Sequence, residues 1–145
     1  MIFWDSSAIV PLLVEEPATQ TVHDIVRRDP AIVVWWATRV ECTSALSRLE
    51  REDRLPVDTV DAARDRLAEL ARSWTEVLPT DDVRSQAARL LLRHALRAAD
   101  ALQLAAALAW GGAEPERHEL CTFDERLSIA ARGEGFRLLP AVSAS

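Results

Sequence analysis

The sequence predicts an α/β sandwich with a mainly parallel sheet. Short apolar runs alternate along the chain with segments of helical periodicity, and this alternation is typical of a sheet covered by helices. The run 31–36 holds β-branched and aromatic residues and no polar side chain, which indicates a strand buried on both faces, as in parallel sheets. The length of 145 residues suits one domain, so we expect a single domain over residues 1–145.

The predicted elements follow one another in a regular order. A strand at 2–4 comes first and leads into a helix that starts at Asp5-Ser6-Ser7, residue types that cap helix N-termini. The other predicted strands cover residues 31–36, 74–78, 119–123 and 136–139. The other predicted helices cover residues 18–28, 38–54, 57–72, 81–95, 98–110 and 124–132. Pro56 separates two of these helices, which we expect to pack as a hairpin.

Composition indicates a globular protein in a reducing compartment. Hydrophobic residues make up 49% of the chain and charged residues 28%, as in folded domains. Cys42 and Cys121 have apolar neighbours and are expected to be free thiols. The N-terminus does not have the pattern of a signal peptide, and the longest apolar stretch, 98–110, is too short to span a bilayer. We therefore expect a cytoplasmic protein that does not associate with a membrane.

The charge balance is acidic, with 17 basic residues against 23 acidic ones and a net charge of −6. This balance argues against a polyanionic partner, unless several of the carboxylates bind metal ions. The chain contains no lysine. A receiver-type signalling domain, which also combines a parallel sheet with an acidic cluster, is thereby excluded, because it needs a lysine to hold the phosphoryl group.

Four acids lie where a parallel sheet gathers functional groups, beyond the carboxyl ends of its strands. Asp5 directly follows the first strand, and Asp124 directly follows the strand at 119–123. Glu41 lies one helical turn after the second strand and should point inward. Asp100 lies in the first turn of an almost wholly apolar helix. We expect these four carboxylates to converge.

Converging carboxylates need a cation, because burying unpaired charge costs several kcal/mol. Hard oxygen ligands without a set of His or Cys favour Mg²⁺ or Mn²⁺ over Zn²⁺. One or two such ions held by carboxylates suit phosphodiester hydrolysis. The four acids therefore predict a metal-dependent nuclease site.

Each acid also has a structural explanation. Asp5 and Asp124 lie at positions typical of helix N-caps, and Thr122 with Glu125 has the spacing of a capping box. Glu41 could pair with a nearby arginine. The prediction of a metal site therefore depends on all four acids together.

These residues together resemble the PIN-domain ribonucleases and, more narrowly, the VapC toxins of bacterial and archaeal toxin–antitoxin pairs. The resemblance covers nearly the whole chain, and its most specific part is the segment 96–108 around Asp100. The motifs that carry it are Asp5-Ser6-Ser7-Ala8-Ile9-Val10, Glu15-Glu16-Pro17, Glu41, the segment 96–108, and Thr122-Phe123-Asp124 with Ala130-Ala131 and Gly133.

The resemblance implies a PIN-like three-layer α/β/α sandwich with a central, mainly parallel, five-stranded sheet. It implies that the four acids are catalytic and bind Mg²⁺ or Mn²⁺, and that the hydroxyls of Ser7 and Thr122 support them. The implied activity is metal-dependent endoribonuclease cleavage of single-stranded or looped RNA. The implied partners are the RNA substrate, a cognate VapB-like antitoxin and a second copy of the chain, with exposed leucines on the helices at 38–54 and 57–72 as a dimer surface.

Other residues leave two interpretations open. Arg89, Arg93 and Arg97 recur every four residues toward Asp100 and could guide an RNA backbone, or they form a solvated helix face. Trp36 is expected in the core, unless it is exposed and stacks on a base.

The main alternative function is a catalytically silent PIN-like module that binds or assembles. The intact set of four acids argues against this alternative, because such a module has no need for mutually repelling carboxylates.

Overall fold

The sheet at the centre of the molecule has five parallel strands in the order β3-β2-β1-β4-β5. The computed structural model describes residues 1–141, so residues 142–145 of the predicted domain lie outside the described part. The strands are β1 (Ile2–Trp4), β2 (Ile32–Trp35), β3 (Thr75–Val77), β4 (Glu119–Cys121) and β5 (Arg137–Leu139). The prediction of a five-stranded parallel sheet is confirmed.

Seven α-helices connect and cover these strands in the described part of the chain. They are α1 (Ser6–Leu13), α2 (Thr19–Arg28), α3 (Thr38–Arg51), α4 (Val57–Ala71), α5 (Asp81–Arg93), α6 (Ala98–Gly111) and α7 (Glu125–Gly133). Every predicted strand and helix is present, and the boundaries differ from the predicted ones by at most three residues. A short 3₁₀ helix at Pro115–Arg117 was not predicted from the sequence.

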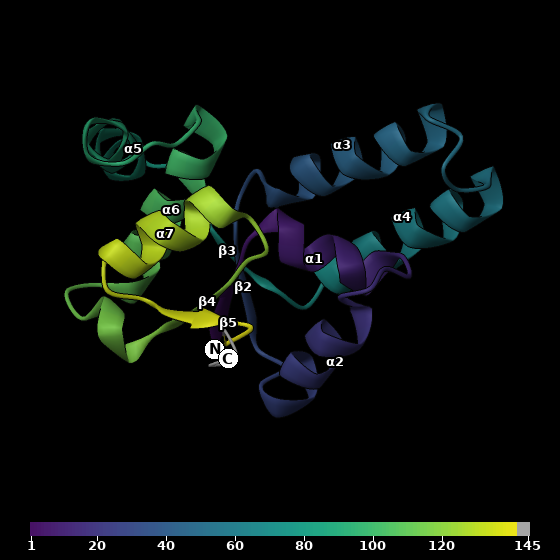
Figure 1. The fold of residues 1–145 in the computed structure, drawn as a ribbon, viewed down its shortest axis with the longest axis horizontal. Coiled ribbons are helices and arrows are strands. Elements are labelled where there is room, and N and C mark those ends of the chain that lie inside the picture. The colour runs from purple at the N-terminus through teal and green to yellow at the C-terminus, as the bar shows by residue number, and fades with distance from the viewer. Residues whose placement is uncertain (142–145) are drawn as a thin grey trace.

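The helices form two layers, one on each face of the sheet (Figure 1). Helices α1 to α4 pack on one face and α5 to α7 on the other. Successive strand residues alternate between these layers, so that Ile2 and Trp4 contact the first layer and Phe3 the second. This arrangement confirms the three-layer α/β/α sandwich.

The two cysteines belong to the core, as predicted. Cys42 and Cys121 are free and fully buried. Burial raises the pKa of both thiols to about 12, so both are neutral and pack as small apolar groups. No helix within residues 1–141 is long and apolar enough to cross a bilayer.

The predicted dimer surface is wrong in its residues. Leu46 on α3 and Leu67 on α4 are buried in the core between the helices and the sheet. The exposed large apolar side chains on these two helices are valines, Val40 and Val57. The leucines point inward because α3 and α4 pack against each other and against α1, which requires an apolar stripe on both helices.

Candidate functional site

Asp5 and Asp124 both cap helices, as the structural explanation predicted. The Oδ2 atom of Asp5 accepts a hydrogen bond from the backbone N–H of Ser7 at 3.3 Å. The Oδ1 atom of Asp124 accepts one from the backbone N–H of Leu127 at 2.8 Å. Each cap uses one carboxylate oxygen, and no hydrogen bond within residues 1–141 reaches Oδ2 of Asp124. A helix cap and an oxygen that can bind a cation are therefore compatible in the same side chain.

The predicted capping box of Thr122 with Glu125 is wrong, because Asp124 is the N-cap of α7. The hydroxyl of Thr122 instead donates to Oδ2 of Asp5 at 2.9 Å. The hydroxyl of Ser7 donates to the same oxygen at 2.6 Å. Each hydroxyl has one proton, so the bond to Asp5 fixes its direction.

The same two hydroxyls also accept hydrogen bonds from the loop between β4 and α7. The backbone N–H of Phe123 donates to Oγ of Ser7 at 2.9 Å, and that of Asp124 donates to Oγ1 of Thr122 at 3.0 Å. The start of α1 is thereby tied to the loop that carries Asp124. Ser7 and Thr122 lie where the sequence placed supporting hydroxyls, in direct contact with an acid of the predicted site.

Glu41 is held by two donors from other elements. Its Oε2 atom accepts from the hydroxyl of Ser6 at 2.8 Å and from Nε2 of Gln103 at 2.9 Å. Gln103 is buried on α6 and also donates to Oγ1 of Thr38 at 3.0 Å. Glu41 has no salt bridge within residues 1–141, so the predicted alternative of an arginine partner has no support.

Ser6 and Gln103 were not predicted from the sequence as partners of Glu41. The available signal was weak, since Gln103 is a polar residue in an apolar helix, three residues after Asp100. A polar side chain at a buried helix position needs a partner, and here that partner is Glu41.

Asp100 lies in the first turn of α6 and is half-buried. It lines a hollow of about 460 Å³ together with Arg97 and Asp124. A second hollow, of about 620 Å³, has Glu41 and Ser7 in its wall and shares Asp124 with the first. We call these two adjoining hollows the carboxylate cleft.

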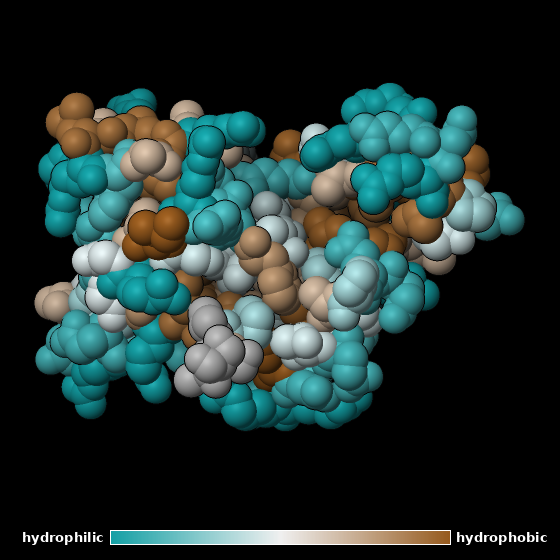
Figure 2. All heavy atoms as spheres, viewed as in Figure 1, coloured by the Kyte–Doolittle hydropathy of each residue, from teal (hydrophilic) through white to brown (hydrophobic). Residues whose placement is uncertain are grey.

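The carboxylate cleft opens at the carboxyl ends of the strands. Figure 2 shows the surface hollowed at the top of the view, between the helices α3 and α4 on the right and the layer of α5 to α7 on the left. Asp5 is buried, while Ser7, which donates to it, reaches the wall of the cleft. All four predicted acids are thus in or directly beside one opening.

Burial and mutual repulsion raise the pKa of three of the acids. Burial raises the pKa of the Asp5 carboxyl most strongly, hydrogen bonds from Ser7 and Thr122 oppose the rise, and the charge of Asp124 adds to it. Burial also raises the pKa of Glu41, against the hydrogen bonds of its donors and with the nearby charges of Asp5 and Asp100.

The pKa of Asp100 is raised by the same two kinds of effect. Burial raises the pKa of its carboxyl, and the charges of Asp124 and Asp5 raise it further, against a smaller opposing effect of Arg97. The four carboxylates therefore interact with one another electrostatically, as the sequence predicted.

No salt bridge relieves this repulsion. None of the salt bridges found within residues 1–141 involves Asp5, Glu41, Asp100 or Asp124. The side chains do not yet form a closed metal site either, since no group of three His, Cys, Asp or Glu residues in the described part is close enough to hold an ion. The donor chemistry nevertheless fits Mg²⁺ or Mn²⁺, because the available groups are carboxylate and hydroxyl oxygens.

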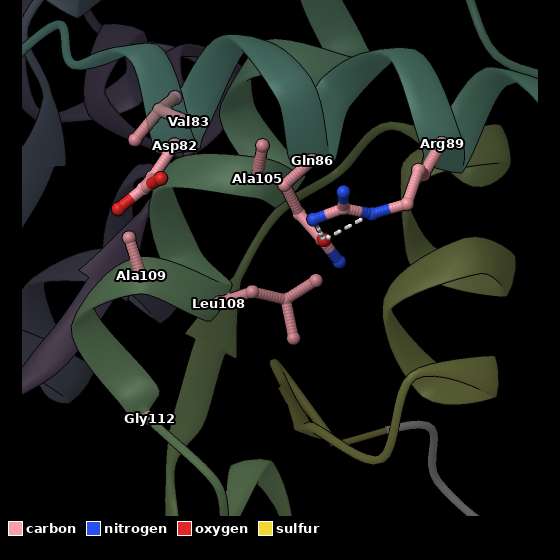
Figure 3. A pocket seen from close by; sticks show the side chains of 8 residues that line it. All are labelled: Asp82, Val83, Gln86, Arg89, Ala105, Leu108, Ala109 and Gly112. Carbon is pink, nitrogen blue, oxygen red and sulfur yellow. Dashed lines mark hydrogen bonds between the residues drawn. The ribbon is translucent and has the colours of Figure 1, made fainter.

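The three predicted arginines do not share one helix face. Helix α5 ends at Arg93, and Arg97 is the N-cap residue of the next helix. Arg89 lies in another hollow, between α5 and α6, where its guanidinium donates to Oε1 of Gln86 (Figure 3). Arg93 pairs with Glu134 at 3.2 Å. Of the three, only Arg97 lines the carboxylate cleft.

Two unpredicted arginines join Arg97 there. Arg48 on α3 lines the hollow that contains Glu41, and Arg126 on α7 lines the hollow that contains Asp100. None of these three guanidiniums forms a salt bridge within residues 1–141. The cleft thus combines carboxylates and guanidiniums that form no salt bridge within residues 1–141.

Comparison with known proteins agrees with this arrangement. The chain matches the family model described as PIN domain over residues 2–133. Ribonuclease VapC45 of Mycobacterium tuberculosis is 30% identical over 148 residues, which cover 97% of this chain and 96% of that protein. Ribonuclease VapC46 of the same organism is 32% identical over 139 residues, which cover 95% of each chain.

Solved structures show the same fold at lower identity. VapC20 of Mycobacterium tuberculosis, described as a sarcin–ricin loop cleaving toxin, has a TM-score of 0.64 at 21% identity, covering 90% of this chain and 95% of that one. FitAcB from Neisseria gonorrhoeae has a TM-score of 0.66 at 17% identity, covering 95% of this chain and 96% of that one. The family model, the relatives and the fold agree, and the chain belongs to the PIN domain family and, within it, to the group of VapC proteins.

Proposed function

We propose that this protein is a metal-dependent endoribonuclease and the toxin of a VapBC-type toxin–antitoxin pair. The observation that carries the proposal is the set of four mutually repelling carboxylates around one cleft, none of which forms a salt bridge within residues 1–141. Two relatives, at 30% and 32% identity over nearly the whole chain, are named ribonucleases. An acidic cluster beside free arginines suits a metal ion and the phosphates of an RNA strand.

Asp5, Glu41, Asp100 and Asp124 would hold the divalent cation, Mg²⁺ or Mn²⁺. When bound, such an ion supplies an activated water at neutral pH and stabilises negative charge on the phosphate and the leaving oxygen. Burial, and to a smaller extent the charges of the neighbouring acids, raise the pKa of three of these carboxyls, and a bound divalent cation would offset both effects.

The chain's own residues orient the acids and bind the substrate. Ser7 and Thr122 hold the carboxylate of Asp5 from two sides. Gln103 and Ser6 hold the carboxylate of Glu41, so that two of the acids are fixed before any ligand arrives. The free guanidiniums lining the cleft would bind the phosphates of a single strand.

The proposal includes an antitoxin, a homodimer and a cytoplasmic location. Among solved structures of the same fold is a toxin–antitoxin complex from Klebsiella pneumoniae, with a TM-score of 0.61 at 15% identity. The dimer stays a prediction, which light scattering on the purified chain would test. Two free buried thiols and no disulfide in the described residues are compatible with the reducing cytoplasm.

The test is cleavage of mixed-sequence single-stranded RNA by the purified protein in Mg²⁺, Mn²⁺ or EDTA. Asp100→Asn, purified in the same way, is the control, because it keeps the shape of the side chain and removes its charge. Cleavage that needs the metal and disappears in the folded variant supports the proposal. Equal cleavage by both proteins would indicate a contaminating nuclease.

The silent-module alternative is supported by one observation, the lack of three acids close enough to hold an ion in the described residues. It predicts no cleavage under any metal, with RNA or partner binding unchanged in Asp100→Asn. The nuclease proposal predicts metal-dependent cleavage by the unaltered protein and loss of that cleavage in Asp100→Asn.

A further inference from the structure

Trp36 is exposed immediately beyond the carboxyl end of β2, although a tryptophan there was expected in the core. Its side chain is 51% exposed, whereas that of its neighbour Trp35 is 4% exposed. The backbone N–H of Trp36 donates to the carbonyl oxygen of Val77 at 3.0 Å. The ring of Trp35 packs edge-on against it, with centroids 6.5 Å apart and planes at 70°. Trp36 therefore presents an exposed aromatic ring that rests against the buried ring of Trp35.

A third hollow lies beside this ring. It has a volume of about 420 Å³ and is lined by Trp36, Glu76 and the α3 residues Arg39, Val40 and Thr43. Val40 is 68% exposed and lines the carboxylate cleft as well. The hollow at Trp36 and the carboxylate cleft are thus neighbours with one shared wall.

The charges of the hollow suit a base edge at Glu76 and a neighbouring phosphate at Arg39. Glu76 accepts a hydrogen bond from Nε1 of Trp74 at 3.1 Å, which holds its carboxylate at the hollow. A carboxylate repels a phosphate but accepts N–H groups from a base edge. Arg39 is in the hollow and Arg48 in the cleft, both without a salt bridge in the described residues, and a strand running between them would keep its phosphates near guanidiniums.

We propose that Trp36, Val40 and Arg39 form a subsite that stacks one unpaired base of the RNA strand whose backbone lies in the carboxylate cleft. The proposal rests on the nuclease function proposed above and adds a position at which the substrate is held. Any base can stack on the flat face of an exposed indole, but only when the base is unpaired and turned out of a helix. The subsite therefore selects for single-stranded RNA and against duplex RNA.

The test measures binding and cleavage separately. In the Asp100→Asn background, which is expected to prevent cutting, the affinity for a fluorescein-labelled single-stranded oligoribonucleotide is compared between Trp36→Ala, Trp36→Phe and Ile129→Ala. Ile129 is 61% exposed on α7 and lines none of the three hollows, so it controls for the loss of an exposed apolar side chain. Thermal unfolding of each variant confirms that it is folded.

Trp36→Ala should weaken binding about 10-fold, within the range of about 5- to 150-fold known for loss of one stacked base. Trp36→Phe should recover most of the affinity, and Ile129→Ala should change nothing. In otherwise unaltered protein, Trp36→Ala should raise KM by a similar factor and leave kcat within about 2-fold.

Two results would overturn the subsite. If Trp36→Ala does not change the RNA affinity of Asp100→Asn, the hollow does not bind a base and a protein partner becomes its expected ligand. This conclusion holds even if the unaltered protein cleaves RNA. Equal weakening of single-stranded and duplex RNA binding would show that no unpaired base is read. If the unaltered protein does not cleave RNA and Trp36→Ala still weakens single-strand binding, the nuclease proposal fails and the subsite stands.

Discussion

The outer helix faces and the carboxylate cleft differ in whether their acids and arginines form salt bridges. On the outer faces, arginines pair with acids three residues away, as Arg84 does with Asp81 at 2.7 Å and Arg27 with Asp24 at 2.8 Å. In the cleft, acids and arginines share the walls of two hollows and form no salt bridge within residues 1–141. The cleft therefore leaves both signs of charge available to ligands.

This difference does not come from a need for stability. Exposed pairs such as Arg84 with Asp81 contribute about 0 to 1 kcal/mol to folding. The unpaired acids of the cleft work against folding, because burial and mutual repulsion raise their pKa. A region that destabilises the fold while keeping its acids in hydrogen-bonded positions is typical of a functional site.

The largest expected effect follows from removing Asp5. Asp5→Ala should lower RNA cleavage at least about 100-fold, the usual cost of one fixed charged or polar group of an active site. It should also lower the free energy of unfolding by about 1 kcal/mol, because the α1 cap is lost. Asp5→Asn keeps a capping oxygen, so it should recover stability in urea unfolding without recovering cleavage. Recovery of both would leave Asp5 with a capping role alone.

Gln103 should have a smaller effect on activity. Gln103→Ala removes a donor to Glu41 and leaves a cavity, so cleavage should fall about 10- to 100-fold and stability by about 1 to 3 kcal/mol. Gln103→Leu fills the volume without donating. If Gln103 positions Glu41, the leucine variant should need more Mg²⁺ for half-maximal cleavage, whereas an unchanged requirement would limit Gln103 to packing.

Substituting one arginine in each region tests whether only the arginine of the cleft binds RNA. Arg97→Ala should weaken single-stranded RNA binding several-fold and lower the slope of log affinity against log salt by about 0.7, the value for one phosphate contact on a single strand. Arg84→Ala, on an outer helix, should change neither quantity and should alter stability by less than about 0.5 kcal/mol. Identical salt slopes for the two variants would contradict a special role of the cleft.

The smallest effect concerns pH. Because Asp5, Glu41 and Asp100 have a raised pKa in the folded protein, the folded state holds protons that the unfolded chain has already released. Stability in EDTA should therefore fall as pH rises from the usual carboxyl pKa through the raised one. In saturating Mg²⁺ the trend should reverse, since protons compete with the metal for the same oxygens. Urea midpoints across this pH range test both signs.

The sequence predicts well what depends on local pattern. Asp5 and Asp124 follow strands directly, so a parallel sheet brings them to the same edge, and the structure does so. Glu41 and Asp100 lie one helical turn into their helices, and the 3.6-residue period aims them at the same opening.

What the sequence does not predict depends on contacts between distant elements. The bond between Glu41 and Gln103 joins the starts of α3 and α6, two helices on opposite faces of the sheet, and no local pattern encodes that meeting. Arg97 was expected to continue the face of Arg93, but the chain leaves the helix at His94, whose backbone is extended at ψ 150°. Exposed leucines on α3 and α4 were expected as a dimer surface, but Leu46 and Leu67 are buried, because an apolar stripe alone does not reveal how many neighbours cover it.

Metal binding by the four acids can be measured without turnover. Thermal unfolding of the unaltered protein and of Asp100→Asn is followed while MgCl₂ or MnCl₂ is added, with NaCl at matched ionic strength as control. If the four acids bind the metal, the unaltered protein should be stabilised by about 2.7 kcal/mol at 100 times the dissociation constant. Asp100→Asn should be stabilised much less, and in EDTA it should be at least as stable as its parent. Equal stabilisation of the two proteins, or none in either, would contradict the claim that the four acids form a metal site.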